Sequence, residues 1–129
     1  MKVRTRVYPP FAIFWLFLIA AGSLTPGKEL PQSGLWDYDK IIHLVFYTIL
    51  AFLLAGWFGG RQPGSIWHAH PYLIAILAGI VYGIIIEALQ EAFVADRYFD
   101  PWDIVANGAG CLLGSFLSFK LEGRSTNAP

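Results

Sequence analysis

Apolar residues fill four long stretches of the chain, and polar residues gather between them. The stretches lie at about residues 8–24, 41–58, 72–93 and 104–119. A helix that crosses a bilayer needs roughly 20 mostly apolar residues, with a range of about 17–25, so each stretch comes near that length. Short connectors favour antiparallel neighbours in a bundle. The pattern therefore predicts an all-α fold: an integral membrane four-helix bundle in a single domain, with a polar tail at 120–129.

The composition favours a membrane protein over a soluble one. Of the 129 residues, 56% are hydrophobic and only 14% are charged, whereas about a quarter of a soluble domain is charged. So little charge cannot cover a globule of this size. We expect the lipid bilayer as the surroundings and no nucleic-acid partner, while a homo-oligomer is compatible with the sequence.

The first stretch has a second interpretation, because MKVRTR followed by an apolar run is also typical of a secretory signal peptide. Ala20 and Gly22 would supply small residues for cleavage. However, Pro9 and Pro10 stand where the apolar region starts, and Trp15 makes it bulky. We therefore expect an uncleaved helix.

Lysine and arginine residues are divided unevenly between the two sides of the predicted bundle. With four spans, one side receives six of them and the other receives three. Cytoplasmic loops usually carry the excess. Both termini are therefore predicted to be cytoplasmic, and the connectors at 25–40 and 95–103 to face outward.

Few residues outside these patterns suggest a cofactor. The only cysteine, Cys111, can form neither an intramolecular disulfide nor a paired-cysteine site. His68 and His70 could bind a metal, but no further ligand lies near them in sequence, so we interpret them as part of a solvated loop.

Small and polar residues share faces of the predicted helices, because positions three and four apart lie on one side of a helix. Three such stripes are Asp39, His43 and Tyr47; Gly79, Gly83, Glu87, Gln90 and Glu91; and Asp103, Asn107, Gly110 and Gly114. Small residues at this spacing let transmembrane helices approach closely. The glycines therefore predict helix contacts, and the polar residues on the same stripes are expected inside the bundle.

The polar residues also lie at similar depth. Glu87 precedes Phe93 by six residues, or about 9 Å along a helix, and Asn107 and His43 each lie one turn inside an acid. An ionisable residue within a span costs about 2.5–3.5 kcal/mol on insertion scales, and it usually has a function. We predict a polar pocket open to the outside. Its candidate residues are Asp39, Lys40, His43, Glu87, Gln90, Arg97, Asp100, Asp103 and Asn107.

Structural roles remain open for the acids near the predicted helix starts. The run from Asp100 to Asp103 has the pattern of a helix N-terminus, with an Asp before a Pro and an acid in the first turn. Asp37 or Asp39 would cap the second helix in the same way.

Other candidates also have structural alternatives. Glu87 would form an ion pair with Lys40 or Arg97, His43 would hydrogen-bond between helices, and Lys40 would extend toward the headgroups.

Four segments of the chain resemble the VanZ-like family. They are SLTP at 23–26, DKIIHLVFYTIL at 39–50, EALQ at 87–90 and RYFDPWDIVANGAGCLLG at 97–114. The resemblance implies a small multi-pass protein of the bacterial cytoplasmic membrane and cell envelope, with about four spans. The family takes its name from an accessory factor in resistance to the glycopeptide teicoplanin. Biochemical activity is not settled by the resemblance.

Three functions agree with the predicted pocket. The favoured one is an accessory protein that binds an envelope component, such as a lipid-linked precursor or a lipid headgroup. The second is an enzyme on such a substrate, in which the carboxylates and His43 hold a hard cation or act as acid and base, and Arg97 faces a phosphate. The third is an ion-coupled carrier that protonates Glu87, although no charge continues a path through the inner half. The sequence identifies neither the ligand nor a cofactor or metal.

Overall fold

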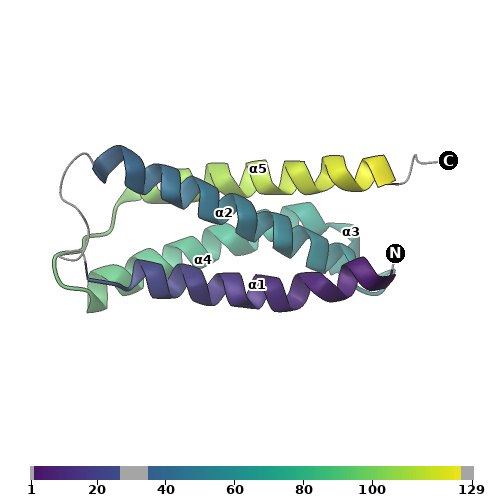
Figure 1. The fold of residues 1–129 in the computed structure, drawn as a ribbon, viewed down its shortest axis with the longest axis horizontal. Helices are drawn as coiled ribbons and strands as arrows, with labels where there is room; N and C mark the ends of the chain where they lie inside the picture. Colours follow the sequence, from purple (N-terminus) through teal and green to yellow (C-terminus); the bar gives the residue numbers. More distant parts are fainter. Residues whose placement is uncertain (1, 27–34, 126–129) are drawn as a thin grey trace.

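The computed structural model describes residues 2–26 and 35–125, and every regular element in this part of the chain is a helix. The elements are α1 (Lys2–Ser23), α2 (Leu35–Gly59), the short α3 (Ile66–Ala69), α4 (Pro71–Phe93) and α5 (Pro101–Ser125), as Figure 1 shows. The four long helices are each long and apolar enough to cross a membrane. The all-α prediction with four candidate spans is therefore confirmed.

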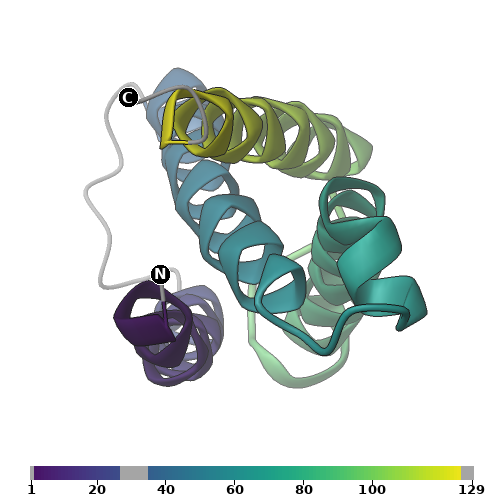
Figure 2. The ribbon, with the colours of Figure 1, turned by 90° about the vertical axis from the view of Figure 1, so that its right-hand side faces the viewer.

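The long helices alternate in direction along the bundle. The Lys2 end of α1 and the Ser125 end of α5 lie at the same end, while α1 and α4 finish, and α2 and α5 start, at the other (Figure 1). α2 contacts each of the other long helices, whereas α1 packs mainly on α2 and stands at the side of the bundle (Figure 2).

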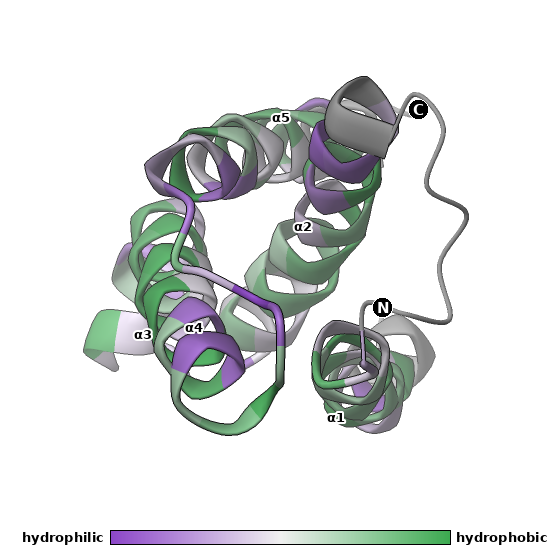
Figure 3. Ribbon diagram, turned by 90° about the vertical axis from the view of Figure 1, so that its left-hand side faces the viewer, coloured by the Kyte–Doolittle hydropathy of each residue, from purple (hydrophilic) through white to green (hydrophobic). Residues whose placement is uncertain are grey.

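The distribution of polarity is that of a protein surrounded by lipid. Large apolar side chains such as Phe17, Leu77 and Leu112 are 72%, 54% and 59% exposed. The buried polar residues include His43, Glu87, Gln90, Asp103 and Asn107. Figure 3 looks at the end where α5 starts: hydrophilic residues gather on the connector and the helix ends, and the helix flanks are largely hydrophobic.

Glycines on α5 bring its backbone against α2. A Cβ atom added at Gly110 would lie 2.5 Å from the Leu44 carbonyl oxygen, and one added at Gly114 would collide with the Thr48 carbonyl oxygen. These partners are backbone atoms of α2, which cannot turn aside as a side chain can. The close approach of α2 and α5 therefore requires glycine at both positions.

Glycines on α4 receive side chains of α5. A Cβ atom added at Gly83 would lie 2.7 Å from Nδ2 of Asn107, and one added at Gly79 would collide with Sγ of Cys111. Gly83 thus leaves room for the Asn107 amide to be buried between the two helices.

The helix boundaries differ from the expected ones. α1 starts at Lys2, before residue 8, and continues through Pro9 and Pro10. Prolines lack the amide donor, and near a helix end the carbonyl groups that lose a donor can be satisfied by water. The predicted polar tail is helical as far as Ser125, while residues 126–129 and most of the connector expected at 25–40, namely 27–34, lie outside the described part.

α2 also starts earlier than expected, at Leu35. Asp37 and Asp39 therefore lie within the helix, and the hypothesis that either caps it is wrong. The expected apolar run at 41–58 covers only part of α2, and the helix begins about one and a half turns before it. Length and hydropathy could not show this polar extension.

Candidate functional site

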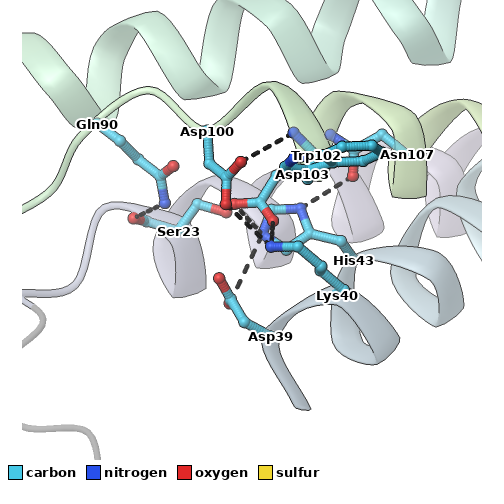
Figure 4. Close-up of polar contacts among 9 residues, drawn as sticks. All are labelled: Ser23, Asp39, Lys40, His43, Gln90, Asp100, Trp102, Asp103 and Asn107. Atoms are coloured by element: carbon cyan, nitrogen blue, oxygen red, sulfur yellow. Dashed lines mark hydrogen bonds and ion pairs between the residues drawn. The ribbon is translucent and has the colours of Figure 1, made fainter. Parts of the chain in front are cut away.

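Lys40 connects the start of α2 to the start of α5. Its Nζ donates to Oδ2 of Asp100 at 2.9 Å and to Oδ1 of Asp103 at 3.2 Å (Figure 4). Asp100 also caps α5, because its Oδ1 accepts the backbone amide of Trp102 at 2.8 Å. Burial tends to raise the pKa of Asp100, but the hydrogen bonds from Lys40 and the Trp102 amide lower it below its usual value. Asp100 therefore caps the N-terminus of α5 with one carboxylate oxygen and forms an ion pair with Lys40 through the other.

His43 is held in one orientation by Asn107. Nδ1 of His43 lies 2.9 Å from Oδ1 of Asn107 (Figure 4). An amide oxygen only accepts, so Nδ1 carries the proton and donates it. The other ring nitrogen, Nε2, then faces two carboxylates, at 3.8 Å from Oδ1 of Asp39 and 3.9 Å from Oδ2 of Asp103. These distances exceed those of a direct hydrogen bond.

Unpaired polar atoms lie next to this network. Both carboxylate oxygens of Glu87, the hydroxyl of Tyr47 and Nδ2 of Asn107 are buried without a hydrogen-bond partner among the described residues. Glu87 and Asn107 are each only 1% exposed. Buried polar groups are nearly always paired in folded proteins. A set of unpaired ones therefore indicates a place for water, an ion or a ligand.

A pocket of about 170 Å³ opens between the end of α1 and the start of α2. Its apolar wall contains Leu18, Ile19, Ile42 and Phe46, and its polar part contains Asp39, His43, Tyr47, Gln90 and Arg97. Nε of Arg97 is buried and has no hydrogen-bond partner among the described residues. The Gln90 amide donates to the Ser23 carbonyl oxygen at 2.7 Å and so fixes the end of α1 against α4 (Figure 4).

The structure places the residues that the sequence nominated at one end of the bundle. Hydrogen bonds join Lys40 to Asp100 and Asp103, and His43 to Asn107. Asp39 and Asp103 lie within 4 Å of Nε2 of His43. Gln90 and Arg97 line the adjoining pocket. The carboxylate of Glu87 interacts electrostatically with Asp103, His43 and Asp39, and the backbone amide of Asp100 lies near it without the geometry of a full hydrogen bond.

Two structural alternatives can now be compared with the geometry. Glu87 does not form the expected ion pair with Lys40 or Arg97 among the described residues; Lys40 is directed toward Asp100 and Asp103. The hydrogen bond between helices expected for His43 is present, with Asn107 as its partner.

Sequence reasoning did not nominate Tyr47 or Ser23 as site residues. Tyr47 continues the stripe of Asp39 and His43, so its spacing was a usable signal. Ser23 contributes its backbone carbonyl group. Every residue has such a group, so the sequence contains no signal that would have identified Ser23. The apolar wall on α1 also gave no signal, because its residues do not differ in type from lipid-facing ones.

His68 and His70 lie at the end of the bundle opposite to this network. His68 and His70 are exposed near α3, and Nδ1 of His68 contacts the Gly59 carbonyl oxygen at 2.7 Å. Cys111 is buried in the core.

Comparison with known proteins gives one match. The model of the VanZ/LLP1 family matches residues 4–121. No curated protein and no solved structure is significantly similar to the chain. The match extends over nearly the whole chain and includes all four candidate spans. The resemblance seen in the four sequence segments is therefore confirmed, and the chain belongs to the VanZ/LLP1 family of multi-pass membrane proteins.

Proposed function

We propose that this protein is an accessory membrane protein that binds an amphiphilic component of the cell envelope, such as a lipid-linked precursor or a lipid headgroup. The observation that carries the proposal is the combination of an apolar wall and a charged part within one pocket. An amphiphile has the same two parts. Its chain would lie along the wall formed by α1 and α2, and its head would lie toward Arg97.

Arg97 supports an anionic head. Its Nε is buried without a partner in the described part of the chain, so an incoming acceptor would satisfy it. A guanidinium group presents planar donors that match the oxygens of a phosphate or carboxylate. The acids of the adjoining network would instead repel such a head, which favours a position beside Arg97 and away from Asp103.

The orientation of the pocket is part of the proposal. The excess of lysine and arginine favours cytoplasmic termini and a pocket that faces outward, in the bacterial cytoplasmic membrane. A link to glycopeptide resistance rests on the family resemblance alone.

Cysteine labelling tests this orientation. In a Cys111→Ala background, Tyr98→Cys should react with an impermeant maleimide added to intact cells, whereas Gln62→Cys should react only after the membrane is permeabilised. Both positions are exposed, and they lie in connectors at opposite ends of the bundle. Reaction of Gln62→Cys but not Tyr98→Cys in intact cells would reverse the proposed orientation.

Loss of the Arg97 charge should reduce lipid retention. Native mass spectrometry of the wild-type protein in a mild detergent should show a retained anionic lipid, and Arg97→Gln should lose most of it because the head loses its donors. Arg61→Gln is the matched control, since Arg61 is exposed in the opposite connector and contacts the Trp57 ring. Equal retention by both variants would contradict the role of Arg97.

An enzyme acting on a lipid-linked substrate is the second candidate. The orientation of His43 by Asn107, with Nε2 facing Asp39 and Asp103, favours it, because a fixed imidazole beside carboxylates is suited to general acid–base chemistry. Turnover of the retained lipid by the wild-type protein, and its loss in His43→Gln, would favour this function over binding alone.

A further inference from the structure

We propose that Asp39, His43 and Asp103 form a binding site for a divalent transition-metal ion. One ligand atom from each residue lies within 4.8 Å of the other two. Nε2 of His43 is 3.8 Å from Asp39 and 3.9 Å from Asp103. Two ligands that are each about 2.1 Å from a shared ion lie about 3–4.2 Å apart, and both distances from Nε2 of His43 fall within this range. The site goes beyond the proposed lipid binding and does not depend on it.

The orientation of His43 is the one that metal binding requires. Nδ1 donates to Oδ1 of Asn107, so Nε2 is free to present its lone pair. A histidine ligand usually donates its other ring N–H to a carbonyl or carboxylate, which fixes the tautomer and the ring plane. Asn107 is buried between α4 and α5, and it is therefore a rigid partner for this purpose.

Lys40 does not occupy the proposed ion position. It contacts Oδ1 of Asp103, while Oδ2 of the same carboxylate faces Nε2 of His43. Asp103 can therefore keep its ion pair and contribute its other oxygen to a metal. Asp39 is 36% exposed and lines the pocket, which gives an ion a route from solvent.

Glu87 provides independent support. Its carboxylate is buried, 1% exposed, and has no hydrogen-bond partner among the described residues. It interacts electrostatically with Asp103, His43 and Asp39, the three proposed ligands. A buried carboxylate is costly unless a cation or hydrogen-bond donors compensate its charge. A divalent ion at the proposed site would supply a positive charge that compensates the negative charge of the Glu87 carboxylate.

The donor set indicates the class of metal. Imidazole nitrogen suits zinc and the neighbouring transition metals, whereas Mg²⁺ and Ca²⁺ prefer oxygen ligands. One imidazole with two carboxylates therefore favours Zn²⁺ or Mn²⁺ over Mg²⁺.

Metal binding is tested on the full chain in a mild detergent, after the protein is stripped with a chelator and then reloaded with Zn²⁺ or Mn²⁺. His68→Gln and His70→Gln are introduced first, because these exposed histidines could bind transition metals adventitiously. We expect one Zn²⁺ or Mn²⁺ per chain after desalting, measured by elemental mass spectrometry. His43→Gln should retain none, and Asn107→Leu should weaken binding by about 10–100-fold, as is typical when the partner of a metal-bound histidine is lost.

The controls separate this site from the lipid pocket and from misfolding. Arg97→Gln should keep the full metal content even where it loses lipid. Size-exclusion elution and a cooperative thermal transition show which variants fold. The measurement on the reloaded protein with intact His43 is decisive by itself: failure to retain one ion per chain would overturn the proposal. Undiminished binding in a folded His43→Gln variant would also overturn it.

Discussion

Glu87→Met should stabilise the metal-free protein, although it removes a charged residue from the centre of the candidate site. Both carboxylate oxygens of Glu87 are buried without a hydrogen bond of good geometry in the described part of the chain, and the Asp100 backbone amide is only nearby. Leaving a buried polar group unsatisfied costs about 1–3 kcal/mol, and replacement by an apolar side chain of similar shape removes this cost. We expect thermal unfolding in detergent to show a higher midpoint, and lipid or metal retention to fall.

Gln90→Met is the matched control for this prediction. Gln90 is also buried, one turn further along α4, but its amide donates to the Ser23 carbonyl oxygen at 2.7 Å. Its replacement should therefore lower the unfolding midpoint, since the part-buried Ser23 carbonyl oxygen loses its donor. A lower midpoint for both variants would show that Glu87 is held by interactions that stabilise the fold, and that it is not kept for binding.

Gly110→Ala should weaken the contact between α2 and α5. The added Cβ atom would lie 2.5 Å from the Leu44 carbonyl oxygen and 3.0 Å from the Thr48 backbone nitrogen. Neither backbone atom can move without shifting α2, so we expect a loss of about 1–3 kcal/mol, as for other overpacked sites. The free energy of unfolding in detergent measures it.

Gly108→Ala offers a control on the same helix. A Cβ atom there would meet nothing within 4 Å, so the variant should be neutral or more stable by up to about 1 kcal/mol, because alanine favours the helix. If Gly108→Ala and Gly110→Ala lost the same stability, helix flexibility rather than close packing would explain the glycine stripe.

Much of the fold could be predicted because a bilayer simplifies the problem. A long apolar run must be a helix when no water is present to satisfy the backbone, so the positions of the four long helices followed from hydropathy. The inward face of α5 followed from spacing: Gly110 and Asn107 lie three residues apart, and both face the interior of the bundle. On α4 the prediction was wrong for Glu91, which is exposed.

The helix ends could not be predicted in the same way. Hydropathy follows the hydrocarbon layer, whereas α2 continues beyond it to Leu35. The extension excludes the capping role considered for Asp39, which stays on the helix face that it shares with His43. The short helix α3 has its N-cap at Ser65, whose hydroxyl accepts the His68 amide at 3.3 Å, and its four residues are too few for periodicity to reveal.

The candidate site was predictable only in part. The acids, His43 and Asn107 lie at similar distances from the outer ends of three predicted helices, so the sequence predicted that they share one depth in the bundle. The choice of partners was not predictable, because Lys40 can reach several carboxylates and only the packing of α2 against α5 selects Asp100 and Asp103. The contribution of α1 to the pocket depends on where this helix packs, which no residue type in α1 indicates.

Photo-crosslinking tests the central claim, that the pocket binds an amphiphile, most directly. A phospholipid analogue with a photoreactive group in its acyl chain is added to membrane vesicles that contain the full-length protein, and crosslinked peptides are identified by mass spectrometry. We expect saturable labelling around Ile42 and Phe46 in the pocket wall, which excess unlabelled lipid suppresses. Val105, which is 57% exposed near the same end of the bundle, should show only weak labelling without saturation. Equal, non-saturable labelling of both regions would contradict a binding pocket and would leave ordinary contact with bulk lipid as the explanation.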